Sequence, residues 1–135
     1  MHRFFLSLFL TMMLVSYGQI DKIGYSKTSI LNSYNSPPCK KDINAIWYCM
    51  ENGHLINYTF TDNKVSSVLY MWEFDSKLDA DEDVEKEKSK YSAIYGKPTM
   101  KGGQAFWFVG DNLLIMCSYA YTNGKHYSTW RVSTH

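Results

Sequence analysis

Short runs rich in apolar and aromatic residues, divided by turn residues, are the main pattern along the chain. The first half contains three such runs, at residues 45–50, 55–61 and 65–72. The second half contains three more, at residues 104–109, 113–121 and 125–132. Asn52-Gly53 and Asn123-Gly124 each stand between two runs, where Asn-Gly favours a tight hairpin because a type I′ turn needs positive φ at both central positions. The pattern therefore predicts two antiparallel meanders of three strands each.

A helix is predicted before each meander. Ser26 can cap a short first helix, because its hydroxyl accepts a hydrogen bond from an otherwise unpaired backbone N–H. This helix should end near Tyr34, since Asn-Ser-Pro-Pro at 35–38 cannot continue it. A longer, charged helix is predicted from about residue 79 to residue 95, and Gly96 stops it. Each half of the chain thus has the order α-β-β-β.

The two halves repeat part of the sequence about sixty residues apart, which indicates a duplication. Six residues recur with a one-residue slip: Tyr34, Pro37 and Lys40 as Tyr95, Pro98 and Lys101, and Ala45, Trp47 and Asn63 as Ala105, Trp107 and Asn123. Neither meander is large enough to be stable alone, so both should share one core. The predicted fold class is α+β: tandem α-β-β-β repeats (about 22–74 and 77–133) form an antiparallel sheet with two helices packed on one face. They make a single compact domain at 19–135.

The predicted turns also predict which side chains share a face of the sheet. A two-residue turn after the first strand places Trp47 opposite Tyr58, and the next turn adds Leu69 to their face. In the second half, Phe106 and Trp130 come to one face. When the repeats are aligned, the face that is richer in apolar and aromatic residues is not the same one in the two halves. The sequence therefore leaves open which face the helices cover.

Both faces carry aromatic residues, whereas only two helices are predicted to cover them. An uncovered aromatic face indicates a binding surface, because Tyr and Trp dominate interface hot spots. Loops, the N-terminal segment or a dimer mate are the alternative cover. The residues predicted to contact a partner are six aromatic side chains expected on one face: Tyr48, Tyr70, Trp72, Phe106, Phe108 and Trp130.

The first residues have the layout of a secretory signal peptide. A basic start is followed by an apolar stretch at 4–15 and then by small residues, and cleavage is predicted between Gly18 and Gln19. The stretch is shorter than the roughly 20 apolar residues of a membrane-spanning helix. We therefore predict a signal peptide at 1–18 and a periplasmic or secreted mature chain with no stable membrane insertion.

Charge and cysteine content limit the partners and the chemistry. Without residues 1–18 the chain keeps 13 of its 14 basic residues and all 13 acidic residues, and this balance argues against nucleic acid as a partner. Three cysteines allow at most one internal disulfide. Cys49 and Cys117 fall in apolar strands and are expected as buried thiols, whereas Cys39 is the candidate for an exposed or bridging thiol. The sequence selects no pairing.

No pattern in the sequence specifies a reaction. Acidic residues alternate from Asp79 to Glu85 as in the first half of a calcium loop, but Val84 and Lys90 occupy positions that such a loop gives to Gly and Glu. We interpret the acidic residues as a helix N-terminus favoured by the helix dipole. The histidines lack the spacing of a metal pair, and Gly-x-Ser-x-Gly is absent. The sequence therefore predicts a protein that is not an enzyme, with no catalytic residue, metal or cofactor.

Part of the first half is similar to a known family. The shared residues are Gly24-Tyr25-Ser26-Lys27, Ile30, Tyr34, Pro37, Trp47-Tyr48 and Phe60-Thr61-Asp62-Asn63-Lys64-Val65. Over about 23–70, and more faintly over 84–132, the chain resembles outer-membrane assembly lipoproteins of the SmpA/OmlA type, and its duplication resembles the two-unit arrangement of the β-lactamase-inhibitor protein (BLIP). The resemblance implies helices on one face of a sheet whose other face can bind protein. The chain lacks the lipid-attachment cysteine of those lipoproteins, and its second unit lacks the Gly-x-Ser/Thr-Lys opening.

These observations lead to one hypothesis and one alternative. The chain is predicted to be an exported small binding protein without catalytic activity that recognises another protein through an aromatic sheet face, as an inhibitor, an immunity protein or an envelope-assembly protein. The alternative is a periplasmic or secreted protein that binds a small ligand, a glycan or a lipid, with the same aromatic residues.

Overall fold

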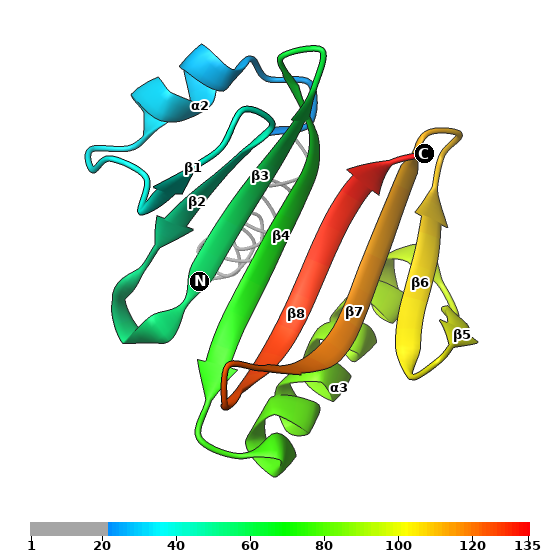
Figure 1. The fold of residues 1–135 in the computed structure, drawn as a ribbon. Helices are drawn as coiled ribbons and strands as arrows, with labels where there is room; N and C mark the ends of the chain where they lie inside the picture. Colours follow the sequence, from blue (N-terminus) through cyan, green and yellow to red (C-terminus); the bar gives the residue numbers. More distant parts are fainter. Residues whose placement is uncertain (1–21) are drawn as a thin grey trace, which may run out of the picture.

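The computed structural model describes residues 22–135, and the predicted signal peptide, residues 1–18, lies outside them. The described residues form one antiparallel sheet of eight strands and two α-helices (Figure 1), which confirms the predicted α+β class. In chain order the elements are α2 (Lys27–Ser33), β1 (Lys40–Lys41), β2 (Ala45–Cys49), the short 3-10 helix η2 (Glu51–Gly53), β3 (Leu55–Thr61), β4 (Lys64–Phe74), α3 (Lys77–Tyr95), β5 (Thr99–Lys101), β6 (Gln104–Val109), β7 (Leu113–Thr122) and β8 (Lys125–Thr134).

Each half of the chain supplies four neighbouring strands. The order across the sheet is β1-β2-β3-β4-β8-β7-β6-β5, so β4 and β8 meet in the middle. The short strands at the two edges, β1 and β5, were not predicted from the sequence. Lysines on them, Lys40, Lys41 and Lys101, make these edges poor templates for pairing with another chain. The two halves have the same order of elements, and the duplication itself stays a prediction.

Serine side chains begin both α-helices. Ser26 Oγ accepts a hydrogen bond from Ser29 N at 3.1 Å, as predicted, and Ser76 Oγ accepts one from Asp79 N at 3.1 Å. Because Ser76 is the cap, α3 begins at Lys77, slightly before its predicted start. Gly96 ends α3 with a φ of 87°, a conformation that favours glycine.

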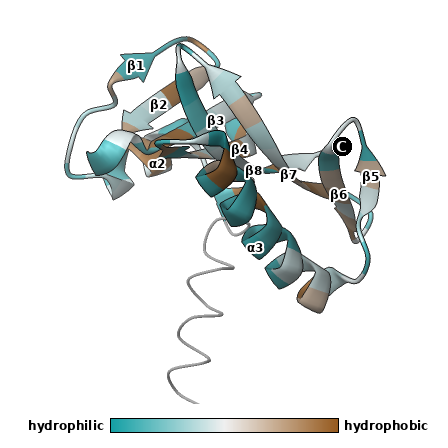
Figure 2. Ribbon diagram, turned by 90° about the horizontal axis from the view of Figure 1, so that it is seen from below, coloured by the Kyte–Doolittle hydropathy of each residue, from teal (hydrophilic) through white to brown (hydrophobic). Residues whose placement is uncertain are grey.

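Both helices lie on one face of the sheet, which we call the covered face (Figure 2). The strand register aligns six side chains of this face across six strands, and each is at most 2% exposed: Ile46, Tyr58, Val68, Val132, Ile115 and Trp107. Tyr34, directly after α2, stacks on Tyr48 with ring centroids 3.7 Å apart. Tyr91 of α3 packs against the rings of Trp107 and Trp130. The hydrophobic core is this layer between the sheet and the helices.

The connection between β2 and β3 shows why the predicted faces were wrong in the first half. Residues 50–54 link Cys49 to its partner Leu55, where the sequence predicted a two-residue turn. Met50 N donates to His54 O at 2.7 Å across this longer connection. The register moves by one position, so that Trp47 lies opposite Asn57 rather than Tyr58. A one-residue shift reverses the face of every side chain in a strand.

A bulge had the same effect in β4, and the predicted face of Phe106 was also wrong. The register between β3 and β4 shifts at Thr59/Phe60, which places Leu69 opposite Asn57 on the face away from the helices. A three-residue loop at 110–112 joins β6 to β7, so Trp107 rather than Phe106 lies opposite Ile115.

The hairpin between β7 and β8 forms as predicted. Asn123 and Gly124 both have positive φ, 52° and 73°, and Thr122 pairs with Lys125. This turn therefore gave the right register, with Cys117 opposite Trp130.

Candidate functional site

The six aromatic residues predicted to share one exposed face lie on two faces. The covered face carries four of them: Tyr48, Tyr70, Trp72 and Trp130. The opposite face carries Phe106 and Phe108. Tyr48 and Trp130 are buried, with 3% and 5% exposure, whereas Phe108 is 63% exposed. The prediction that the six form one surface is therefore wrong. Tyr48, Tyr70 and Trp72 share a face as predicted, but Phe106 and Phe108 lie on the face opposite Trp130, because Trp107 rather than Phe106 pairs with Ile115.

Aromatic side chains of the covered face pack on one another beneath the helices. Tyr34 Oη and Tyr58 Oη form a hydrogen bond of 2.6 Å, and Tyr70 contacts the ring of Trp130 with centroids 5.4 Å apart. Burial raises the pKa of Tyr34, of Tyr48 and of Tyr58 above the ordinary value for tyrosine. These groups stabilise the core. Trp72 differs from them, since it is 43% exposed and lies beside the ring of His54.

Among the described residues no helix lies over the opposite face, which we call the open face (Figures 1 and 2). One row of paired residues crosses six of its strands: Trp47, Asn57, Leu69, Arg131, Met116 and Phe106. Leu114 and Phe108 form a neighbouring pair, and Met71 lies on the other side of the row. Aromatic residues, Met and Arg are the residue types enriched in protein interfaces. The open face therefore has the composition of a protein-binding surface.

Polar residues buried in the open face are paired with one another. Asn57 Nδ2 donates to Ile46 O at 3.3 Å, and Thr59 Oγ1 donates to Asn57 Oδ1 at 3.1 Å. The hydroxyls of Ser118 and Thr129 lie 2.8 Å apart on neighbouring strands. These hydrogen bonds satisfy polar groups that would otherwise be costly to bury. They fix the positions of the strands that carry the apolar side chains of this face.

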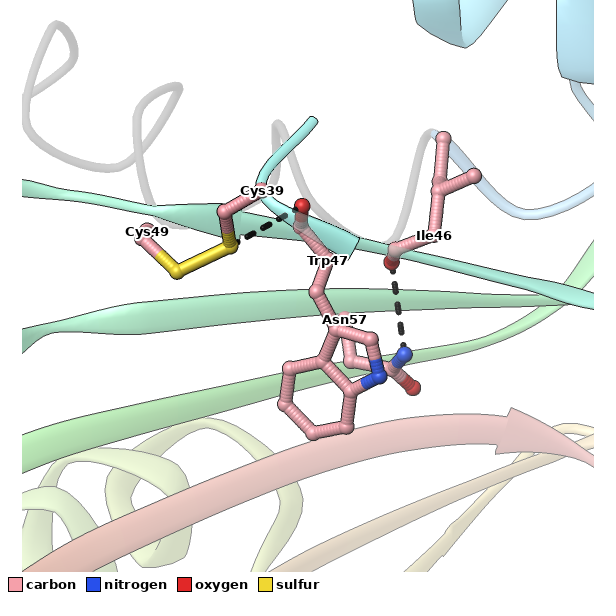
Figure 3. The surroundings of a disulfide bond; sticks show 5 residues. All are labelled: Cys39, Ile46, Trp47, Cys49 and Asn57. Carbon is pink, nitrogen blue, oxygen red and sulfur yellow. Dashed lines mark hydrogen bonds between the residues drawn. A yellow bond between two sulfur atoms is a disulfide. The ribbon is translucent and has the colours of Figure 1, made fainter. Parts of the chain in front are cut away.

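A disulfide fixes the edge of the open face next to Trp47 (Figure 3). Cys39 and Cys49 form this bond, with Cα atoms 5.8 Å apart, and Cys39 N donates to Trp47 O at 2.8 Å. The predicted bridging role of Cys39 is confirmed. Cys49 was expected as a buried thiol, and this was wrong, because Cys49 is exposed at the end of β2 where Cys39 can reach it. Cys117 is the buried free thiol that the sequence predicted.

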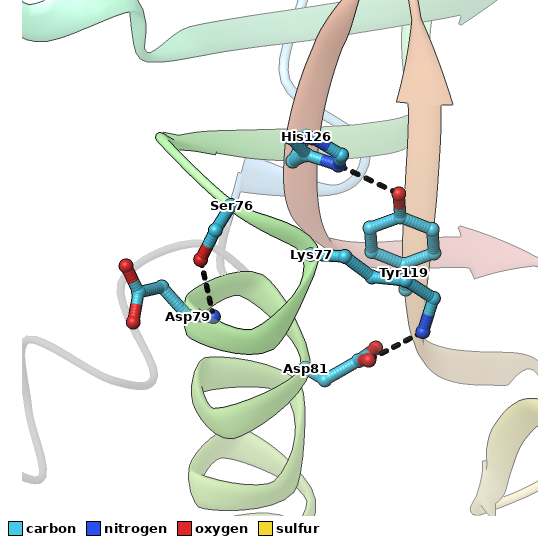
Figure 4. Close-up of polar contacts among 6 residues, drawn as sticks. All are labelled: Ser76, Lys77, Asp79, Asp81, Tyr119 and His126. Carbon is cyan, nitrogen blue, oxygen red and sulfur yellow. Dashed lines mark hydrogen bonds and ion pairs between the residues drawn. The ribbon is translucent and has the colours of Figure 1, made fainter.

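A polar cluster joins the start of α3 to the hairpin of β7 and β8 (Figure 4). Lys77 Nζ pairs with Asp81 and lies 4.7 Å from the ring centroid of Tyr119. Tyr119 Oη in turn lies 2.8 Å from His126 Nδ1. The cluster anchors α3 to the strands beside it, and it occupies His126 with a structural contact.

Cys117 lies on the covered face, and His54 lies in the connection between β2 and β3. Within residues 22–135, no group of three or more His, Cys, Asp or Glu side chains could hold a metal ion. Burial, with Glu87 and Asp83 nearby, raises the pKa of Cys117 to about 12, so its thiol is protonated and weakly nucleophilic at neutral pH. His54 Nδ1 accepts a hydrogen bond from Glu73 N at 3.3 Å.

Neither helix described here combines the length and the apolar character that crossing a bilayer requires.

Trp47 and Arg131 belong to the row of the open face but were not among the predicted contacts. Trp47 was predicted to share a face with Tyr58, because the assumed two-residue turn paired the two residues, whereas it lies opposite Asn57. Arg131 had a usable signal, since it is the one Lys, Arg, Asp or Glu within residues 126–134 of β8. A charge in the middle of a strand indicates a side chain that reaches solvent.

Comparison of the chain with protein-family models, with curated proteins and with solved structures finds no match. The resemblance to the SmpA/OmlA type and to BLIP stays a prediction.

Proposed function

We propose that the chain is an exported small binding protein without catalytic activity, which recognises another protein through the open face. The observation that supports this proposal most strongly is the row of apolar side chains around Arg131, over which no described helix lies. Each face of a sheet is normally either covered by other elements or polar. An apolar face without a cover is therefore typical of an interaction site. Tyr48 and Trp130, which were predicted to contact the partner, lie on the covered face and are not part of the proposed surface.

Export is supported by the exposed disulfide. Cys39 and Cys49 are both at the surface, where cytosolic reductants would reduce such a bond. An oxidising compartment keeps it formed, and the signal-peptide pattern at 1–18 agrees with this location. The mature chain would then act in the periplasm or outside the cell. The resemblance to the SmpA/OmlA type and to BLIP supports an inhibitor, immunity or envelope-assembly role for it.

The proposal is tested by comparing two exposed aromatic residues on opposite faces. Phe108 lies on the open face and is 63% exposed, and Trp72 lies on the covered face and is 43% exposed. The mature chain and its Phe108→Ala and Trp72→Ala variants, each shown to be folded, are used to capture partners from envelope and secreted fractions of the source cells. We expect a specific partner that is retained by wild type and Trp72→Ala and lost by Phe108→Ala.

Two results would contradict the proposal. A partner lost by Trp72→Ala and retained by Phe108→Ala would move the interface to the covered face. A rise in melting temperature with a defined glycan or lipid, in the absence of any captured protein, would favour the small-ligand alternative instead.

A further inference from the structure

We propose that the partner of the open face presents a carboxylate inside an apolar patch, and that Arg131 binds this carboxylate. This inference rests on the proposed function and adds the chemistry of the partner to it. Arg131 lies near the middle of the sheet on β8, opposite Leu69 on β4 and Met116 on β7. Its side chain is exposed and makes no ion pair or hydrogen bond with any residue in 22–135.

The open face carries more positive than negative charge. By their place in the strands, Lys40, Lys101 and Arg131 all lie on this face. Among the described residues, Glu73 is the one carboxylate in the strands of the open face. Its Oε1 lies 3.1 Å from Lys125 Nζ, so the two form an ion pair. Acidic residues gather instead on α3, whose sequence contains six carboxylates and four lysines. The face thus attracts an acidic partner, and α3 repels one.

The surroundings of Arg131 set the geometry of the expected contact. Its neighbours across the strands, Leu69 and Met116, are apolar, and the polar pair Ser118 and Thr129 beside them already bind each other. A partner that covers this row would remove the guanidinium from water, which is costly unless the partner supplies an opposite charge. A carboxylate can accept two parallel hydrogen bonds from a guanidinium, whereas a second cation would be repelled. Arg131 therefore selects for an acidic side chain at the centre of the partner's apolar surface.

The test begins with a partner identified through the open face itself. A photo-reactive phenylalanine analogue is placed at position 108 of the full mature chain, and the protein that it cross-links in the native fractions is purified. The dissociation constant of this purified protein is then measured for wild type, Arg131→Glu and Lys86→Glu. Lys86 is an exposed residue of α3, so its variant changes the net charge equally but leaves the open face unchanged.

We expect Arg131→Glu to weaken binding by at least about 30-fold, because a desolvated charge pair is replaced by two like charges. Lys86→Glu should stay within about threefold of wild type, since surface charges away from a contact have small effects. Replacing the partner's central Asp or Glu with Lys should restore binding to Arg131→Glu. Arg131→Gln, which removes the charge and keeps a polar side chain, is measured beside it, and the melting temperatures show that both variants are folded.

The contrary outcomes separate this inference from the proposed function. If Arg131→Glu binds the cross-linked partner as tightly as wild type does, the inference is wrong while the open face remains the binding surface. If Lys86→Glu weakens binding as much as Arg131→Glu does, the net charge of the chain rather than Arg131 determines the dissociation constant, and the inference is again wrong. If position 108 cross-links no protein, the proposed function fails and the inference fails with it.

Discussion

Trp47 and Trp107 lie in corresponding strands of the two halves, and the sequence repeat equates them, yet they face opposite sides of the sheet. Trp107, on β6, is 2% exposed, donates from Nε1 to Gly96 O at 2.9 Å and packs against Tyr91 of α3. Trp47, on β2, is half-buried on the open face, and its carbonyl accepts a hydrogen bond from Cys39 N. One tryptophan joins a strand to a helix, and the other lies where a partner could reach it.

The difference teaches that the connections around a strand decide the role of its side chains. Trp107 shares the covered face with Ile115 because a three-residue loop sets the register between β6 and β7. Trp47 faces away from the helices because the longer connection at 50–54 shifts the register between β2 and β3. Two similar strand sequences therefore serve two purposes, the core in one half and a surface in the other.

Replacing each tryptophan with alanine is the most direct way to break this comparison. Trp107→Ala should lower the free energy of unfolding by about 3–5 kcal/mol, because it leaves a cavity beneath α3 and removes the hydrogen bond to Gly96. Trp47→Ala should lower it by about 1 kcal/mol or less, because solvent already reaches that side chain. Urea unfolding of both variants measures the two values. Equal losses would mean that the two faces are equally buried, contrary to the structure.

The disulfide gives the next largest effect, and it belongs to the open-face edge. Cys39 and Cys49 are separated by 10 residues, and removing a cross-link over so short a loop should lower the free energy of unfolding by about 2–3 kcal/mol. The double variant Cys39→Ser/Cys49→Ser is compared with wild type by urea unfolding. Amide hydrogen exchange should become faster in β1 and β2 and stay unchanged in β6 and β7. Faster exchange in both halves would show that the disulfide stabilises the whole sheet rather than one edge.

Much of the fold could be predicted from local sequence signals. Ser26 and Gly96 mark helix ends through their own backbone chemistry, and the bounds of β3 and β6 agree with the predicted runs. Asn123-Gly124 gave a correct register, because two residues with positive φ leave a single hairpin geometry. Each of these features depends on a few neighbouring residues, which a sequence displays directly.

The candidate site could not be placed in the same way, because a face depends on connections that have no such rule. Asn52-Gly53 suggested a two-residue turn, but both residues belong to the short helix η2 within a longer connection. The bulge beside Phe60 was not predicted from the sequence. Phe106 and Phe108 were identified as candidates that lie on the open face, whereas Tyr48 and Trp130 are core residues. The residue types of the surface could be predicted from the sequence, whereas the register of the strands that carry them could not.

Alkaline titration sharpens the comparison, because five tyrosines with a raised pKa cluster around the covered face. Burial is the main cause for each of them: Tyr34, Tyr48, Tyr58, Tyr70 and Tyr91. The fold thus favours the neutral phenol, and this stabilisation is fully present below the ordinary pKa of 10.0 and is lost as the pH rises through the higher pKa of the folded state.

Above pH 10, a tyrosine whose pKa in the folded chain lies well above the pH should lower the free energy of unfolding by up to about 1.4 kcal/mol per pH unit. Tyr58→Phe removes one of these groups, so its urea-unfolding curves between about pH 10 and 11 should show a slope smaller by that amount. Absorbance of the phenolate in the folded and unfolded chains follows the titration directly. An unchanged slope in Tyr58→Phe would mean that Tyr58 titrates as freely in the folded chain as in the unfolded one.

The smallest effect concerns the thiol of Cys117, which lies at 0% exposure on the covered face, over which α3 packs. In the folded chain it should not react with a thiol reagent near neutral pH, both because it is buried and because its pKa is raised to about 12. Reaction then requires α3 to open, so the rate reports the stability of this helix.

Ser76→Ala removes the cap of α3 at a cost of about 1 kcal/mol, which should raise the rate about fivefold. Ser26→Ala removes the equivalent cap of α2 and is the matched control, expected to leave the rate unchanged because α2 covers the other half of the sheet. Equal acceleration by both variants would show that the thiol is exposed only when the whole sheet unfolds, so that the two helices protect the covered face as one unit.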